Sequence, residues 1–351
     1  MLEFDGFFER RIIALERIER LTAWVRTVLP TPLIDLQPAS ADASFRRYFR
    51  ACNQAGSFIV MDAPPSHEDC KPFIHIARLF RAAGANTPEI IAENLAEGFL
   101  LLSDFGDTTY LTALQADEND ADRLYRDANT ALIKIQSASQ PDELPAYNAE
   151  LLLREMRLFP DWYLNKHVNI QLNTEQQRVL DSTFNTILAN NLAQPQVYVH
   201  RDWHSRNLML TEGGKHGDNP GVLDFQDAVY GPITYDLASI YKDAYIRWDE
   251  ERVLDWVVRY WEAARRAGLP VNTDFGAFYR DFEWMGVQRH IKVLGIFARL
   301  SHRDGKTGYL KDMPLVMDYL RKACNRYNGL GDFLRLLDAI AGKQAEAGYT
   351  F

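Results

Sequence analysis

The chain has 351 residues, of which 47% are apolar and 12% aromatic, enough to bury a core in two domains or one bilobal unit. Its 39 Lys and Arg residues against 48 Asp and Glu residues leave a net charge of −9, which argues against a nucleic-acid partner. Three scattered cysteines make no disulfide framework, and neither a secretory signal nor a membrane span is visible, so we expect a cytoplasmic protein with no membrane partner.

The first hundred residues predict one helix followed by short strands. Helical periodicity runs from Gly6 to Leu29, and Pro30 and Pro32 end it. Strand-like runs occupy Leu33–Leu36, Phe45–Ala51, Ser57–Asp62, Thr87–Glu93 and Gly98–Ser103, with a helix predicted over Glu68–Ala83. From residue 104 the pattern becomes helical, and helices are predicted over Thr109–Ala116, Asp120–Ser139, Glu150–Val168, Thr174–Leu192, Asp249–Ala267 and Asp274–Leu300. The change near residue 103 marks a domain boundary.

A stretch near the middle of the chain carries the strongest chemical signal. The triplet from His200 to Asp202, with Asn207 five positions after the aspartate, reproduces the kinase catalytic-loop spacing H-R-D-x-x-x-x-N. Asp224 follows where a kinase carries the metal-binding aspartate of D-F-G. Asp202 would accept the proton of a substrate hydroxyl, and Asn207 and Asp224 would hold Mg²⁺ on ATP. A His and an Asp that merely tie loops together are the alternative, but three residues at fixed offsets favour a kinase.

This motif leads us to expect an α+β, bilobal, protein-kinase-like fold. Residues 1–103 would form a small β-rich nucleotide-binding lobe, and residues 104–351 a larger, mostly helical lobe for catalysis and acceptor binding. ATP phosphates would meet backbone amides and Ser40 or Ser44 in the turn P-A-S-A-D-A-S, although an ordinary hairpin turn is the alternative. Adenine would meet the backbone of Leu102 and Ser103. The third strand ends in Met61 where a kinase has its ATP lysine, so either another cation binds the phosphates or ATP binding is lost.

Several residues are candidates for contacts with the acceptor. Glu155 lies on the helix predicted over Glu150–Val168, where a polar residue could equally cover a solvated face. Arg289 and Lys292 are three positions apart on a predicted helix, so they share a face that could receive an anionic acceptor or simply be solvated. Candidates flanking the catalytic motif are His204, Arg206 and Asp227.

Segments along almost the whole chain resemble the aminoglycoside-phosphotransferase superfamily. They are H-R-D-W-H-S-R-N-L-M, L-D-F-Q-D-A-V-Y-G-P-I-T-Y-D-L-A-S, D-A-S-F-R-R-Y-F-R, V-M-D-A-P-P and G-I-F-A-R-L-x-x-R-D-G-K. Within the superfamily they are most similar to the bacterial N-acetylmuramate/N-acetylglucosamine anomeric kinases of cell-wall recycling. The resemblance implies transfer from ATP to the anomeric hydroxyl of the amino sugar, giving the α-1-phosphate. We expect a monomer whose partners are ATP, Mg²⁺ and an amino sugar.

The same resemblance implies a role for each motif residue. Asp202 matches the catalytic base, Asn207 and Asp224 the magnesium ligands, and His200 the histidine that anchors the loop. Met61 departs from the family's ATP lysine. Gln226 stands where a protein kinase has the glycine of D-F-G, so we expect no mobile switch there.

Two other functions stay open at this point. An aminoglycoside or choline-like kinase would want an acidic acceptor pocket, which the net charge of −9 permits. A nucleotide-binding pseudokinase that serves as a scaffold is suggested only by Met61.

Overall fold

The computed structural model describes residues 16–41, 45–211 and 218–348, and these form two compact units. The first unit contains the described residues up to Thr108 together with Met209–Asp227, and the second contains Thr109–Leu208 and the described residues from Ala228 onward. Ser44 and the beginning of the predicted helix from Gly6 lie outside the described residues. The proposed lobes, 1–103 and 104–351, stay a prediction.

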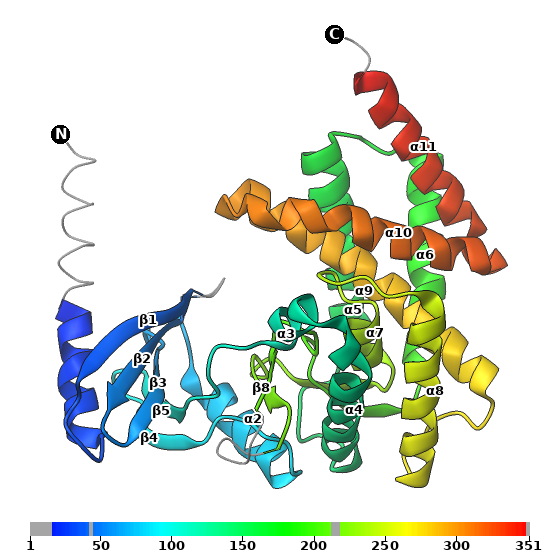
Figure 1. Cartoon of the computed structure of the whole chain (residues 1–351). Coiled ribbons are helices and arrows are strands. Elements are labelled where there is room, and N and C mark those ends of the chain that lie inside the picture. Colours follow the sequence, from blue (N-terminus) through cyan, green and yellow to red (C-terminus); the bar gives the residue numbers. More distant parts are fainter. Residues whose placement is uncertain (1–15, 42–44, 212–217, 349–351) are drawn as a thin grey trace, which may run out of the picture. The chain divides into compact units, whose positions relative to one another are not determined.

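An antiparallel sheet of five strands is the centre of the first unit (Figure 1). Its order is β1-β2-β3-β5-β4, and the strands are β1 (Asp35–Ala41), β2 (Arg47–Asn53), β3 (Gly56–Asp62), β4 (Ile90–Asn94) and β5 (Phe99–Ser103). The helix described over residues 16–28 packs Leu21 and Val25 against Val60 and Leu101, which are fully buried. Side chains alternate along a strand, so Met61 points to the other face from Val60. Helix α2 (Cys70–Ala82) begins after Asp69, whose carboxylate caps it.

Strand β1 is longer than the sequence predicted. The run Leu33–Leu36 was expected to end before Pro38, but β1 continues to Ala41, with a register shift between Pro38 and Ser40. Proline lacks an amide donor and is tolerated at a sheet edge or a bulge, and β1 is an edge strand. Part of the expected phosphate-binding turn is therefore strand.

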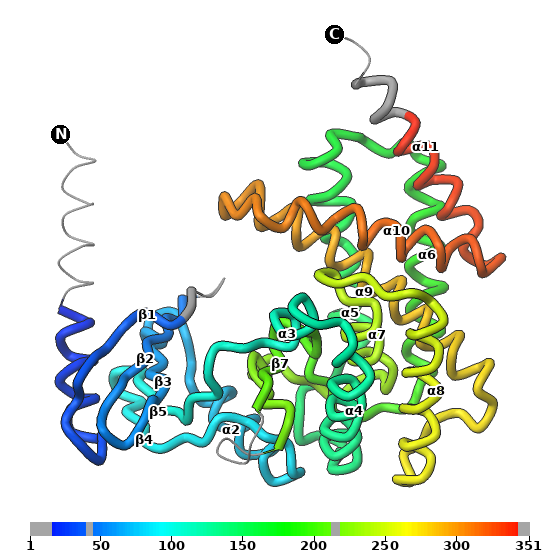
Figure 2. The backbone as a smooth tube through the Cα atoms, viewed as in Figure 1, coloured from blue at the N-terminus to red at the C-terminus, as the bar shows by residue number. Residues whose placement is uncertain are grey.

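Helices make up most of the second unit. They are α3 (Tyr110–Ala116), α4 (Ala121–Ser137), α5 (Ala149–Leu158), α6 (Thr174–Leu192), α7 (Tyr235–Tyr241), α8 (Glu250–Arg266), α9 (Phe275–Asp304), α10 (Met313–Arg326) and α11 (Gly331–Gly348). Helix α9 is central, because it packs on α5, α6, α7 and α10, and Figure 2 shows α10 running beside it. Strands β6 (Gln196–Val199) and β9 (Val229–Pro232) pair antiparallel. The short strands β7 (Leu208–Met209) and β8 (Gly221–Val222) pair with each other.

The single helix predicted over Glu150–Val168 is two different helices. Helix α5 ends at Leu158 and continues as the π-helix η2 (Phe159–Val168). Pro160 lies at the transition between the two helices, where its missing amide N–H interrupts the α-helical hydrogen-bond ladder. Helix α9 crosses here at close range, because a Cβ on Gly295 would lie 2.4 Å from the carbonyl carbon of Leu158. The crossing places α5 and α9 in direct contact.

Length alone does not make any of these helices a membrane span. Helix α9 has 30 residues, yet neither it nor any other helix in the described ranges contains a stretch apolar enough to cross a bilayer.

Candidate active site

The loop after β6 is held by one buried carboxylate. Both oxygens of Asp236 accept backbone N–H groups, from His200 at 2.7 Å and from Arg201 at 3.1 Å. Arg201 has φ 76°, a left-handed conformation that is unfavourable for a residue with a Cβ atom. Asp236 lies in the first turn of α7, so these two hydrogen bonds tie that helix to the loop. The strained turn sets the backbone position of the next residue, Asp202.

Further hydrogen bonds close the loop around Asp202. Its backbone N–H donates to Nδ1 of His200, 3.2 Å away, and the His200 side chain is fully buried. The Asp202 carbonyl oxygen accepts the His204 backbone N–H at 3.0 Å and the Asn207 side-chain amide at 3.0 Å. His200 therefore positions the loop, whereas the Asp202 carboxylate is turned outward with 39% of its side chain exposed.

Replacing Asp236 with asparagine tests this tether. An amide can accept only one of the two backbone N–H groups, so we expect Asp236→Asn to lower the free energy of unfolding by about 2 kcal/mol. Turnover should also fall, by about a hundredfold, because small displacements of reacting groups are costly.

Burial raises the pKa of Asp236 to about 7 against the effect of the two N–H donors. Wild-type kcat should therefore rise with pH through about 7 as the carboxylate ionises, and the variant should lack this rise.

Urea unfolding and a pH profile of kcat measure both effects. Asp249→Asn is the matched control, since Asp249 precedes helix α8 without making a side-chain cap bond. A pH profile of Asp236→Asn identical to that of the wild type would contradict the tethering role.

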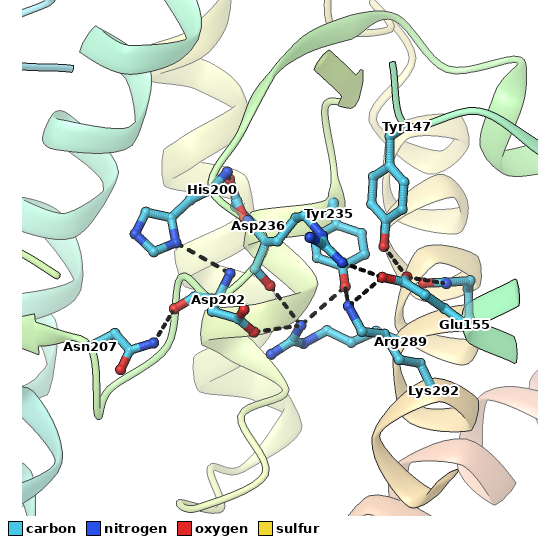
Figure 3. A network of polar contacts seen from close by, with 11 residues as sticks. Tyr147, Glu155, His200, Asp202, Asn207, Tyr235, Asp236, Arg289 and Lys292 are labelled. Atoms are coloured by element: carbon cyan, nitrogen blue, oxygen red, sulfur yellow. Dashed lines mark hydrogen bonds and ion pairs between the residues drawn. The ribbon is translucent and has the colours of Figure 1, made fainter. Parts of the chain in front are cut away.

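A buried ionic network lies behind Asp202 (Figure 3). The Glu155 carboxylate accepts Arg201 at 2.5 Å and Lys292 at 3.0 Å, and it also accepts the Tyr147 hydroxyl. Lys292 and Glu155 are only 6% and 7% exposed. Burial raises the pKa of Glu155, but Lys292 and Arg201 outweigh it, so the pKa lies below its ordinary value. Glu155 therefore forms a buried ion pair with Arg201 of the loop after β6.

Arg289 links this network to Asp202. Its Nη1 donates to the Arg201 carbonyl oxygen at 2.9 Å and to the Tyr235 hydroxyl at 3.3 Å, and it lies 4.0 Å from the Asp202 carboxylate. Partial burial raises the pKa of Asp202, but the nearby charges of Lys292 and Arg289 lower it to about 2. Asp202 is therefore ionised at neutral pH.

A pocket opens at Asp202 within the second unit. Its cavity volume is about 130 Å³, and it combines a charged end with an apolar and aromatic wall. The charged and polar lining residues are Asp202, His204, Asp243, Arg289 and Lys292. The wall consists of Ala244, Tyr245, Val293, Ile296, Phe297, Leu300 and Tyr309. An apolar wall with a few polar groups at one end is typical of sites for small organic molecules.

The carboxylate of Asp243, at this pocket, is hydrogen-bonded to other groups of the protein. Its carboxylate accepts the backbone N–H and the hydroxyl of Ser205 and the backbone N–H of Tyr245. His204 packs edge-on against the Tyr245 ring, with ring centroids 5.4 Å apart. Burial lowers the pKa of His204 more than Asp243 raises it, so this imidazole is neutral at pH 7. The pocket has no excess of negative charge.

Other predicted residues belong to the first unit. Asp224 has φ 61°, its carboxylate accepts the Gln226 amide at 2.9 Å, and the following Phe225 packs between Phe73 and Phe80 of α2. Asp227 is exposed. The expectation of no mobile switch at this turn stays a prediction.

The predicted nucleotide contacts also lie in the first unit. Leu102 pairs with Ile59 and Ile90 inside the sheet. The Ser103 N–H donates to the Glu89 carbonyl oxygen, and its hydroxyl accepts the Glu89 N–H. Ser40 is a strand residue whose side chain lies outside the described part of the chain. Met61 is fully buried. The adenine and phosphate roles stay predictions.

The residues present suit a hard divalent cation. The Asn207 amide nitrogen donates to the Asp202 carbonyl oxygen, and the other end of this amide is an oxygen, a ligand type that Mg²⁺ accepts. Asp224 contributes a carboxylate, and amide and carboxylate oxygens are the ligands that Mg²⁺ prefers. Asn207 belongs to the second unit and Asp224 to the first, and their roles as Mg²⁺ ligands stay predictions.

Sequence reasoning missed several residues at the site. Tyr147, Tyr235, Ser205 and Asp243 make buried hydrogen bonds there. Helical spacing from Asp236 could not identify Asp243, because α7 ends at Tyr241, before Asp243. Tyr147 carried no signal either.

Comparison with known proteins finds consistent similarity. A model of a family described as phosphotransferase enzymes matches residues 35–271. An N-acetylmuramate/N-acetylglucosamine kinase of Neisseria meningitidis serogroup B is 47% identical, covering 96% of this chain and 100% of that protein. A Pseudomonas aeruginosa protein of the same name is 46% identical, over 92% and 97% of the two chains. The crystal structure of ADP-bound aminoglycoside phosphotransferase APH(2'')-Ib is 15% identical, with a TM-score of 0.57 and coverage of 87% and 97%, and it shares the fold.

Proposed function

The chain belongs to the phosphotransferase enzyme family, and on that premise we propose that it is an ATP-dependent sugar kinase acting on N-acetylmuramate and N-acetylglucosamine. The phosphoryl group goes to the anomeric hydroxyl and gives the α-1-phosphate, a product suited to the recycling of cell-wall sugars. The observation that supports this most is the pocket, which joins an ionised Asp202 to an aromatic wall. The apolar face of a sugar ring packs well against such a wall.

In the proposed reaction, Asp202 orients the sugar hydroxyl and takes its proton. A new bond forms between that oxygen and the γ-phosphorus, and the bond between the γ-phosphorus and the β,γ-bridging oxygen breaks, so that ADP leaves. A carboxylate with a pKa of about 2 is too weak a base to ionise a hydroxyl in advance, so the proton moves as the new bond forms. Mg²⁺ bound by Asn207 and Asp224 would neutralise phosphate charge. Arg289, 4.0 Å away, stabilises the charge of the carboxylate.

The charges of the pocket favour a sugar over a cationic acceptor. Two carboxylates, Asp202 and Asp243, face two cations, Arg289 and Lys292, and His204 is neutral. Among the described residues that line the pocket, Asp243 is already bonded to backbone and hydroxyl donors, and the charge of Asp202 is balanced by the nearby Arg289 and Lys292. This balance weighs against aminoglycosides and choline.

A blocked acceptor tests the proposed position of transfer. The purified chain should turn over both amino sugars with Mg-ATP and produce an anomeric phosphate, detected by ³¹P NMR. The methyl glycoside of N-acetylglucosamine has no free anomeric hydroxyl and should be inert. Turnover of this glycoside would overturn the position, and turnover of kanamycin or choline in place of the sugars would overturn the acceptor class. Thermal shift with Mg-ATP but no turnover of any acceptor would indicate a pseudokinase.

A further inference from the structure

Arg206 is a cation at the edge of the acceptor pocket. It follows Asp202 by four positions and is exposed. Its guanidinium carbon lies 4.6 Å from the centroid of the Tyr245 ring and 5.8 Å from that of Tyr309. Both rings belong to the pocket wall. Cation–π contacts of this kind hold a guanidinium in place without neutralising its charge.

The other cations of the pocket already have partners. Lys292 is paired with the Glu155 carboxylate at 3.0 Å and donates to the Tyr235 hydroxyl at 2.9 Å. Arg289 donates to a backbone carbonyl and is near Asp202. Over the ranges that the structure describes, Arg206 forms no ion pair with a carboxylate. It is therefore the pocket-side cation best able to receive an anion.

We propose that Arg206 binds the carboxylate of an acidic acceptor and so distinguishes N-acetylmuramate from N-acetylglucosamine. This inference rests on the proposed function. The two sugars differ by a lactyl ether on ring carbon 3, whose carboxylate lies some way from the anomeric hydroxyl. A guanidinium offers two parallel N–H donors to a carboxylate, and this one is already oriented by two rings.

The exposure of Arg206 explains how one pocket accepts both sugars. If the cation that binds the carboxylate were buried, it would be desolvated and unpaired in the complex with N-acetylglucosamine. That sugar would then be strongly disfavoured as a substrate. An exposed cation stays hydrated and stacked on Tyr245 when the neutral sugar binds. The carboxylate consequently adds affinity for one substrate without excluding the other.

Kinetics with both sugars test the assignment. Arg206→Ala should lower kcat/KM for N-acetylmuramate by about 30-fold, mainly through KM, because a hydrogen bond between charged groups is lost. The value for N-acetylglucosamine should stay close to that of the wild type. Arg206→Lys should restore part of the activity on N-acetylmuramate. With the wild-type protein, kcat/KM for the methyl ester of N-acetylmuramate should be lower than for the acid by the same factor that Arg206→Ala causes with the acid. The Arg206→Ala variant should have the same kcat/KM for acid and ester.

Arg252→Ala provides the matched control. Arg252 also stacks on two rings, 4.6 Å from Trp248 and 5.1 Å from Trp256, but none of these three residues lines the pocket. This variant should leave the preference between the sugars unchanged. If Arg206→Ala lowers kcat/KM equally for both sugars, or for neither, the inference is overturned while the proposed kinase function stands. A wild-type protein inactive on both sugars would overturn the proposed function and this inference with it.

Discussion

Asp202→Asn is expected to reduce kcat by about a thousandfold, because the variant keeps the shape of the side chain and loses its ability to accept a proton. The wild-type carboxylate lies at the charged end of the pocket and is 39% exposed, with Arg289 4.0 Å away. Asparagine can still hydrogen-bond a hydroxyl, so sugar affinity should change little. The loss should therefore fall equally on kcat and kcat/KM, which is typical of an interaction made only in the transition state. Steady-state kinetics and calorimetric titration of N-acetylglucosamine measure the two quantities.

Asp202→Glu is the companion variant for this prediction. It keeps the negative charge but moves the carboxylate outward by one methylene, and we expect it to be impaired as well, because position matters as much as charge. The pKa of about 2 also means that the wild-type enzyme should lose no activity by protonation of Asp202 above about pH 4. Turnover of Asp202→Asn within a few fold of the wild type would refute the proton-acceptor role.

The parts of the fold that follow local rules were predicted well. Helix α6 was predicted over Thr174–Leu192 and has those bounds, because Asn173 and Gln176 form a capping box at its start. Pro160 was a local signal for a change after Leu158, but the close packing of α9 at Gly295 against this point was not predictable. Such a contact joins residues far apart in the chain and leaves no periodic pattern.

The site shows the same division between local and tertiary information. The offset of three between Arg289 and Lys292 correctly predicted a shared face, and both side chains line the pocket. Sequence could not reveal that Lys292 is paired with Glu155, since their partnership depends on the crossing of α5 and α9. Arg206 was a candidate contact from the motif alone, whereas the structure shows how Tyr245 and Tyr309 flank it.

Glu155→Gln is expected to be the most destabilising of these substitutions. The carboxylate is 7% exposed and bonds to Arg201, Lys292 and Tyr147. Glutamine would leave two cations buried without their anion, and removing one partner of a buried ion pair costs about 3–5 kcal/mol. Urea unfolding at pH 7 should show this loss. Turnover should fall too, because Arg201 precedes Asp202 in the strained turn.

The dependence of this loss on pH has a definite sign. The pKa of Glu155 is lowered in the folded protein, so its ionised form stabilises the fold above the unfolded pKa of about 4.3. That stabilisation disappears as pH falls through the lower, folded pKa. The difference in unfolding free energy between wild type and Glu155→Gln should therefore be full at pH 7 and smaller below about pH 4.

A second buried carboxylate separates stability from catalysis. Glu283 on α9 is 3% exposed and bonds to Lys242 at 3.1 Å, Arg326 at 2.6 Å and the Tyr327 hydroxyl at 2.7 Å, and it does not line the pocket. Glu283→Gln should lose a similar amount of stability, while its folded molecules keep kcat near the wild-type value. Glu155→Gln should lose kcat even at a temperature where it is fully folded. If the two variants have equal kcat under those conditions, Glu155 stabilises the fold without positioning Asp202.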